Sequence, residues 1–196
     1  MRQLVISAET YIFPTYLYTT VVWKEDDAFF IGKAQRGFDL DTVEGKKINN
    51  EDIFPPASSG IRICADAIDM FVKVPCLLHY DGSPETIKIP VLQEIECFEK
   101  IGKFGTSPYV VQYNGCQVRN GLAVGICLEK CPHKLDDAID KGLITDVNAF
   151  IDKVKQGLEF IHSAGYIHDD INNTNVMVME NGDPKIIDFD SCKPIG

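Results

Sequence analysis

Three polar residues near the end of the sequence have the types and spacing that phosphoryl transfer requires. Asp170 is followed five residues later by Asn175, and Asp188 comes thirteen residues after that. Each lies at the edge of a short apolar segment, so a hairpin of two such segments can bring the three side chains to one point. A carboxylate beside a hydroxyl, with an amide and a second carboxylate that hold Mg²⁺, is the arrangement this chemistry needs. The alternative is a set of turn residues, because Asp and Asn side chains often stabilise turns.

The segments around these residues predict a long helix followed by a β-hairpin. Apolar residues recur at steps of three and four between Val147 and Ile161, behind Thr145 or Asp146 as the N-cap and ahead of Ala164-Gly165, which is helical spacing with start and stop signals. Two short strands are then predicted at 176–179 and 185–187, on either side of Asn181-Gly182-Asp183.

The first two thirds of the chain predict a mostly β region with one helix. We expect a hairpin of Tyr16–Trp23 and Ala28–Ala34 and a polar loop or linker over 37–60. Further on, the patterns predict a strand at 70–74, a helix through Val91 and Ile101, and two strands at 110–113 and 122–128 joined by Arg119-Asn120-Gly121.

Two motifs in the C-terminal part resemble those of the protein kinase family. The run from His168 through Asp170 to Asn175 is similar to the catalytic loop H-R-D-L-x-x-x-N, and Asp188-Phe189-Asp190 is similar to D-F-G. The chain resembles in particular short kinase-like proteins of filamentous fungi with an H-N-D-I-N-P-S-N loop and a D-F-D-S-C motif. The resemblance implies that Asp170 is the catalytic base, that Asn175 and Asp188 bind the metal, and that His168 braces the loop.

The same resemblance extends upstream and implies a nucleotide site. Lys73, in Phe71-Val72-Lys73, would hold the phosphates of ATP, and Glu94 would orient Lys73. Glu96 and Glu99 lie on the same predicted helix and compete with Glu94 for this role, and a solvated lysine at a strand edge is the alternative for Lys73. The segment Leu128–Cys131 would form the hinge, which places Glu129 and Cys131 beside the adenine.

We therefore expect an α+β, protein-kinase-like fold of two lobes, with ATP and Mg²⁺ between them. Residues 1–60 would form a β-hairpin extension and linker, and 61–196 the kinase-like domain, with an N-lobe to about residue 128 and a partial helical C-lobe over 132–196. Because the sequence ends eight residues after Asp188, we expect an incomplete C-lobe. Its helix 147–161 would then expose an apolar face that a partner protein could cover.

Several positions depart from the kinase pattern and leave the function open. Asp169 replaces the arginine of the catalytic loop, Asn172 replaces its lysine, and Asp190 replaces the glycine of D-F-G. No G-x-G-x-x-G precedes Lys73. If the hairpin at 16–34 took the place of that loop, its acidic tip, Glu25-Asp26-Asp27, would repel phosphates, so nucleotide affinity would be weak.

Three functions are consistent with these residues. The first is transfer of the γ-phosphate of ATP to Ser or Thr of a protein substrate, and the second is a pseudokinase that binds a partner without turnover. The third is a small-molecule kinase of the aminoglycoside or choline type, which Asp190 favours, whereas the helix end Phe160–Tyr166 favours a protein kinase.

Composition and charge exclude other classes of function. Nineteen Lys and Arg against 29 Asp and Glu give a net charge of −10, which disfavours nucleic acid and membrane surfaces as partners. The seven cysteines include no C-x-x-C pair, which argues against a zinc site or disulfide scaffold and for an intracellular, cytoplasmic protein. The longest uncharged stretch near the N-terminus, Thr10–Trp23, has fourteen residues and is too short to span a bilayer.

Overall fold

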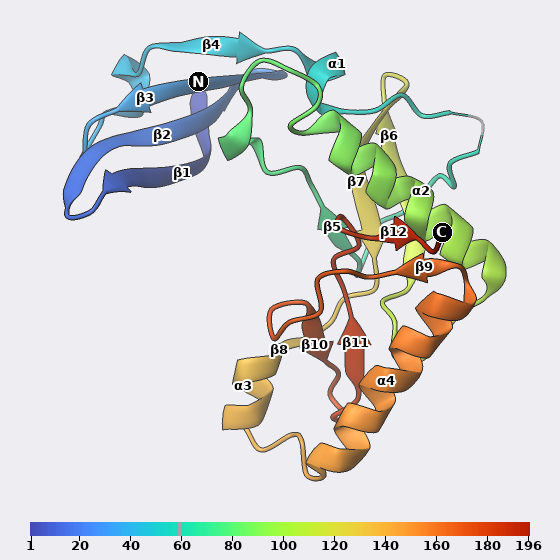
Figure 1. The fold of residues 1–196 in the computed structure, drawn as a ribbon. Coiled ribbons are helices and arrows are strands. Elements are labelled where there is room, and N and C mark those ends of the chain that lie inside the picture. Colours follow the sequence, from blue (N-terminus) through green and yellow to red (C-terminus); the bar gives the residue numbers. More distant parts are fainter. Residues whose placement is uncertain (59) are drawn as a thin grey trace. The chain divides into compact units, whose positions relative to one another are not determined.

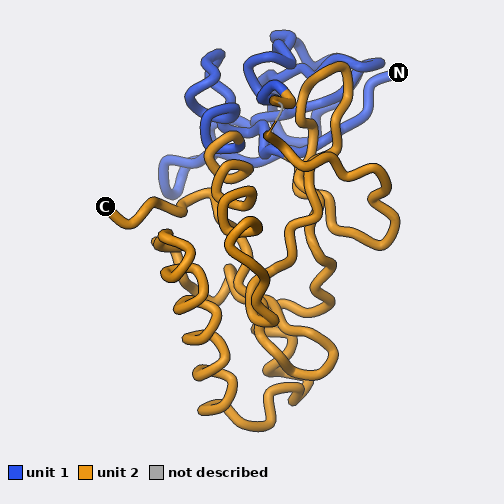
Figure 2. The backbone as a smooth tube through the Cα atoms, turned by 90° about the vertical axis from the view of Figure 1, so that its right-hand side faces the viewer, with its two compact units in different colours: residues 1–56, 75–91 blue, residues 57–74, 92–196 orange. Residues whose placement is uncertain are grey.

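The computed structural model describes residues 1–58 and 60–196 and divides into two compact units. The first unit comprises residues 1–56 and 75–91, and the second comprises 57–74 and 92–196 (Figure 2). Residues 75–91 thus fold with the N-terminal part of the chain. The predicted boundary near residue 60 remains a prediction.

The first unit is built on a four-stranded antiparallel sheet (Figure 1). Its strands lie in the order β1-β2-β3-β4 and span Arg2–Ile12, Thr15–Glu25, Ala28–Ala34 and Gly45–Ile48. The predicted hairpin is confirmed as β2 and β3, with Asp26 in the turn at a φ of 54°. Val21 and Trp23 of β2 are fully or almost fully buried and pack with Val43, and Trp23 stacks on Phe30 at 5.6 Å between ring centroids.

The prediction of a loop throughout residues 37–60 is wrong for part of this segment. It contains the short helices η1 (Leu40–Thr42) and α1 (Asn50–Ile53) as well as β4. Polar composition concealed these elements because the side chains of Asp39 and Asn49 cap the two helices. The strand β4 is only four residues long and is specified by its pairing with β3. A third short helix, η2 (Leu77–His79), belongs to the same unit.

The second unit contains a three-stranded sheet and the helix α2 (Lys88–Phe104), most of which belongs to this unit. The sheet has the order β5-β7-β6, with β5 at Phe71–Lys73, β6 at Tyr113–Arg119 and β7 at Leu122–Leu128. The predicted turn is confirmed, because Asn120 and Gly121 join β6 and β7 with φ values of 52° and 76°.

The predicted strand at 110–113 is wrong, since β6 begins only at Tyr113. Residues 109–111 instead pair with a strand much later in the chain, β11 (Pro184–Ile186). Val111 N donates to Ile186 O at 2.9 Å, and Ile186 N donates to Tyr109 O at 2.9 Å. This exchange ties the segment that follows α2 to the strand that precedes Asp188.

The second unit also contains the predicted long helix, α4 (Val147–Ser163). Asp146 is its N-cap and accepts a hydrogen bond from Ala149 N at 3.0 Å. Figure 1 shows α4 in orange beside β11, which forms a sheet of order β11-β10-β8. The other elements are β8 (His133–Lys134), α3 (Leu135–Asp140), β9 (Tyr166–Ile167), β10 (Val176–Val178) and β12 (Lys193–Pro194).

The expected exposed apolar face of α4 is only partly present. Phe150 and Ile161 are buried, and Phe150 packs with Ala138, Val176 and Val178. Val147 and Ile151 are the exposed members, at 62% and 45% of their surface. Among the described residues, no helix is both long and apolar enough to cross a membrane.

Candidate functional site

One lysine joins three separate elements of the second unit. Lys73 is the last residue of β5. Its Nζ donates to Glu94 Oε1 on α2 at 2.7 Å and to Asp188 Oδ1, two residues after β11 in the chain, at 2.5 Å. Glu94 Oε1 also accepts a hydrogen bond from Phe189 N at 3.2 Å. The expected pairing of Lys73 with a helix glutamate is therefore present, and Glu94 is the residue that makes it.

Burial and charge act in opposite directions on this cluster. Glu94 is only 2% exposed, and this burial raises the pKa of its carboxyl although Lys73 opposes the shift. Burial alone would lower the pKa of the Lys73 ammonium, but the charges and hydrogen bonds of Glu94 and Asp188 outweigh it and raise that pKa. Lys73 is therefore a charged group at neutral pH, positioned by two carboxylates.

The competing glutamate on α2 has a different, structural environment. Glu99 Oε1 accepts hydrogen bonds from Tyr113 OH at 2.8 Å and from Arg62 N at 2.5 Å. It is also buried, at 8% exposure. Glu94 and Glu99 thus contact different neighbours, and helical spacing alone does not show which of them lies beside Lys73.

The backbone positions Asp188 and buries the residue that follows it. Asp188 has a φ of 64°, a left-handed conformation that is uncommon outside glycine and is often found at functional sites. Phe189 is 1% exposed, and its ring lies 4.7 Å from that of Phe98 and 5.1 Å from that of His168. Phe189 therefore packs α2, through Phe98, against the loop that carries Asp170.

Asp170 and Asn175 contact each other directly in that loop. Asn175 Nδ2 donates to the Asp170 carbonyl and to Asp170 Oδ2, both at 2.9 Å. Asn172 Nδ2 donates to the other carboxylate oxygen, Oδ1, at 3.0 Å. Asp170 is exposed while Asn175 is buried, so a buried amide orients an accessible carboxylate.

Two hydrogen bonds connect this loop to the segment of Asp188. Ile187 N donates to Asn175 O at 3.0 Å, and His168 Nε2 donates to Ile187 O at 2.8 Å. His168 is almost fully buried. Its role in the structure is to connect the two loops.

The two residues of the expected hinge, Glu129 and Cys131, lie directly after β7. Glu129 N donates to Gln112 O at 2.9 Å, and its carboxylate pairs with Lys185 Nζ at 2.7 Å. Burial and the Glu129 charge raise the pKa of the Cys131 thiol to about 11. Sequence reasoning missed Lys185, because a lysine within a short strand gives no local sign that it is buried or paired with a residue 56 positions earlier.

The structure thus gathers the predicted residues in two groups within one unit. Lys73, Glu94 and Asp188 form the first, and Asp170 and Asn175 form the second. The bonds of Ile187 link the two groups, while Glu129 and Cys131 form no hydrogen bond or ion pair with either group among the described residues.

Comparison with known proteins identifies the family. A family model described as the protein kinase domain matches residues 78–196, more than half of the chain. The chain belongs to the protein kinase family. The α+β kinase fold expected from the sequence, with a β-rich and a helical part, is thereby confirmed.

The curated relatives include several protein kinases. The chain is 35% identical over 99 residues to mitogen-activated protein kinase kinase kinase 17 of Arabidopsis thaliana, covering 46% of this chain and 27% of the relative. It is 32% identical over 140 residues to kinase kinase kinase 18 of the same plant, covering 59% and 39%. It is 32% identical over 106 residues to the serine/threonine-protein kinase Tao of Drosophila melanogaster, covering 52% and 10%. The chain therefore spans well under half the length of these kinases.

Two departures from the kinase pattern have a visible structural setting. Asp169, which replaces the arginine of the loop, forms an exposed ion pair with Lys193 of β12. Lys73 lies in the sheet β5-β7-β6, whereas the hairpin β2-β3 belongs to a different sheet. A replacement for the kinase glycine loop would belong to the same sheet as Lys73. The acidic tip of that hairpin does not.

Proposed function

We propose that this chain transfers the γ-phosphate of Mg-ATP to a Ser or Thr hydroxyl of a protein substrate. The observation that carries the proposal is that Lys73 is ion-paired with Glu94 and Asp188, and that Ile187, beside Asp188, is hydrogen-bonded to Asn175 of the loop that carries Asp170. The relatives with serine/threonine-protein kinase names support a protein rather than a small molecule as the phosphate acceptor.

Lys73 is suited to hold the phosphates of the nucleotide. An ammonium group has three N–H donors, and two of them are directed to Glu94 and Asp188. The third remains for a phosphate oxygen, and the raised pKa keeps the group charged. The backbone of Glu129 and Cys131 would meet the adenine.

The side chains of Asn175 and Asp188 fit a magnesium ion. The Asn175 Nδ2 group is used by Asp170. Its oxygen, Oδ1, accepts a long hydrogen bond from Thr174 Oγ1 at 3.4 Å and is the atom that would face a cation, while Asp188 would add a carboxylate. Mg²⁺ prefers oxygen ligands of this kind. When bound, the ion would neutralise negative charge on the phosphates.

Asp170 would act as the base for the acceptor hydroxyl. The hydroxyl oxygen would form the new bond to the γ-phosphorus, the bond from that phosphorus to the ADP oxygen would break, and the hydroxyl proton would pass to the Asp170 carboxylate. Asn172 and Asn175 each hold one carboxylate oxygen, and a carboxylate has further lone pairs for the proton. Their contribution is orientation of the base.

The test is phosphate transfer from radiolabelled ATP to a generic protein substrate. Asp170→Asn should lower transfer by about 10²–10⁴-fold, the usual contribution of a positioned base. Asp152→Asn is the matched control and should retain full transfer, because Asp152 is exposed on α4 and its one ion pair among the described residues is with Lys155. Equal transfer by the wild type and Asp170→Asn would contradict the proposal.

A pseudokinase is the second candidate, favoured by the structure around Lys73. The sheet β5-β7-β6 has only three strands in the described part of the chain, and no glycine-rich loop precedes Lys73. The melting temperature in Mg-ATP separates the candidates, because a ligand at 100 times its Kd adds about 2.7 kcal/mol of stability. A rise without phosphate transfer would indicate a pseudokinase, and no rise at millimolar Mg-ATP would count against the kinase.

A further inference from the structure

The sheet of the first unit carries a polar patch on one face. Residues that pair across neighbouring antiparallel strands point to the same face. Thr20 pairs with Lys33 and Ile31 pairs with Lys46, and Tyr18 lies two residues before Thr20 on β2. These five residues therefore share a face, opposite to the face that buries Trp23.

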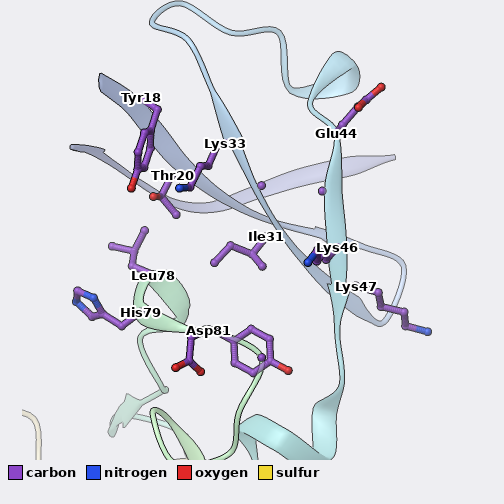
Figure 3. A pocket seen from close by; sticks show the side chains of 14 residues that line it. Tyr18, Thr20, Ile31, Lys33, Glu44, Lys46, Lys47, Leu78, His79 and Asp81 are labelled. Atoms are coloured by element: carbon purple, nitrogen blue, oxygen red, sulfur yellow. The ribbon is translucent and has the colours of Figure 1, made fainter. Parts of the chain in front are cut away.

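The loop from Leu78 to Gly82, which belongs to the same unit, lies beside this patch and forms with it a cavity that is partly open to solvent (Figure 3). The cavity has a volume of about 600 Å³, which falls in the range of small-molecule sites. Ile31 and Leu78 supply apolar walls, and Figure 3 shows Thr20 and Lys33 beside the hydroxyl of Tyr18. The hollow therefore combines apolar surface with a small number of polar groups.

Three lysines line the cavity, and two of them, Lys33 and Lys46, are close to each other and pair with no carboxylate in the described part of the chain. Lys33 follows Gly32, which pairs with Gly45, so Lys33 and Lys46 are diagonal neighbours on adjacent strands. Diagonal positions are about 7–8 Å apart, within reach of long side chains. Among residues 1–58 and 60–196, neither lysine forms an ion pair with a carboxylate. Both side chains are exposed, so their ammonium groups are accessible to a ligand.

The lining carries a small excess of positive charge, because three lysines stand against the two acidic residues Glu44 and Asp81. Lys33 Nζ lies 3.8 Å from the centroid of the Tyr18 ring, and its hydrogen bond helps to lower the pKa of the Tyr18 hydroxyl. Of the two acidic residues at the rim, Glu44 points away from the cavity in Figure 3. Asp81 Oδ1 is used within its own turn by Ser83 N at 2.9 Å and Thr86 Oγ1 at 3.3 Å.

We propose that this cavity is a binding site for a small organic anion. Its phosphate or carboxylate group would contact Lys33 and Lys46, and its apolar part would lie against Ile31 and Leu78. An anion here relieves the repulsion between two like charges on one sheet face. The proposal is independent of the kinase site, because every lining residue belongs to the first unit.

The test is calorimetric titration of the full chain with phenyl phosphate. We expect saturable binding that weakens by about tenfold in Lys33→Gln and in Lys46→Gln, since each substitution removes a charged hydrogen-bond donor. Lys103→Gln is the matched control, because Lys103 is an exposed lysine of α2 in the second unit and does not line the cavity. It should leave the affinity within about twofold, the effect of a distant surface charge.

Three further titrations define the ligand and can overturn the proposal. Benzoate separates a carboxylate from a phosphate preference, and inorganic phosphate, which lacks the ring, should bind more weakly than phenyl phosphate. Equal losses in all three lysine variants would indicate a general charge effect and contradict the site. Absence of saturation at millimolar phenyl phosphate, or binding that disappears in Lys73→Met, would also contradict it.

Discussion

Lys73 Nζ lies 2.7 Å from Glu94 Oε1, although 21 positions separate the two residues in the chain. The same oxygen accepts the backbone N–H of Phe189. One carboxylate oxygen therefore connects β5, α2 and the segment that carries Asp188. The position of α2 and that of Asp188 are linked through this atom, so a change at either partner should be measurable at the other.

The first prediction concerns the charge of Glu94 when Lys73 is replaced. In Lys73→Met, burial acts on Glu94 without its cation, so the pKa of Glu94 should rise further. When the pKa of a carboxyl is higher in the folded state than in the unfolded state, the protein loses stability as the pH rises from the unfolded-state pKa to the folded-state pKa. We therefore expect Lys73→Met to be destabilised by about 2–3 kcal/mol near neutral pH and to recover part of this loss at about pH 5.

The control for this prediction is the double variant Lys73→Met/Glu94→Gln. It has no carboxyl at position 94, so the pH-dependent part of the destabilisation should disappear while the loss of the ion pair remains. Urea unfolding at several pH values measures both effects. A constant difference between wild type and Lys73→Met across the pH range would show that Glu94 is not the titrating group.

The second prediction compares two glycines inside helices. A Cβ on Gly157 of α4 would lie 2.8 Å from Ile186 Cδ1 and 3.1 Å from the Tyr109 carbonyl oxygen. A Cβ on Gly102 of α2 would have Arg62 Nη2, at 3.7 Å, as its one neighbour within 4 Å from outside the helix in the described part of the chain. Alanine gains about 1 kcal/mol over glycine in a helix interior. Gly102→Ala should therefore stabilise the protein by up to that amount, and Gly157→Ala should destabilise it by about 1–3 kcal/mol through overpacking.

Thermal unfolding of the two variants under one condition is the measurement. Because both substitutions change glycine to alanine, differences in the unfolded chain largely cancel between them. Stability changes of opposite sign in the two variants would confirm that the absence of a side chain at Gly157 allows α4 to pack closely against β11 and Tyr109. An increase in stability for Gly157→Ala would show that this approach is looser than the structure indicates.

Features that depend on contacts between residues near each other in the chain were predicted from the sequence. The spacing of Asp170 and Asn175 is local, and so are the cap of α4 at Asp146 and the turn at Asn120. The spacing and the turn were predicted, and Asp146 was one of two predicted caps, with Thr145. The pairing of Lys73 with a helix glutamate came from a resemblance, because nothing local joins residues 21 positions apart.

The features that the sequence did not predict depend on distant partners. The strand β1 was not anticipated, β4 was assigned to a loop, and residues 109–111 were assigned to the wrong strand because their partner, Ile186, is about 75 positions away. The resemblance favoured Glu94, but helical spacing left Glu96 and Glu99 as competitors. Only the tertiary contacts separate Glu94, beside Lys73, from Glu99, beside Tyr113.

The third prediction uses Cys131 as a probe of the proposed adenine site. Burial and the negative charge of Glu129 raise the pKa of its thiol to about 11 from the ordinary value of 9.0, while Lys185 acts in the opposite direction. Only the thiolate reacts with iodoacetamide, so alkylation at neutral pH should be slow and should accelerate about tenfold per pH unit below that pKa. Glu129→Gln should speed the reaction, and Lys185→Gln should slow it.

Mass spectrometry of the alkylated peptides gives the rate for each cysteine, with the exposed Cys76 as the internal control that neither variant should affect. If the backbone of Cys131 meets the adenine, Mg-ATP will slow alkylation of Cys131 and leave Cys76 unchanged. The same rate for Cys131 with and without saturating Mg-ATP would place the nucleotide elsewhere. Rate changes of the same sign in Glu129→Gln and Lys185→Gln would show that access, and not the pKa of the thiol, controls its reactivity.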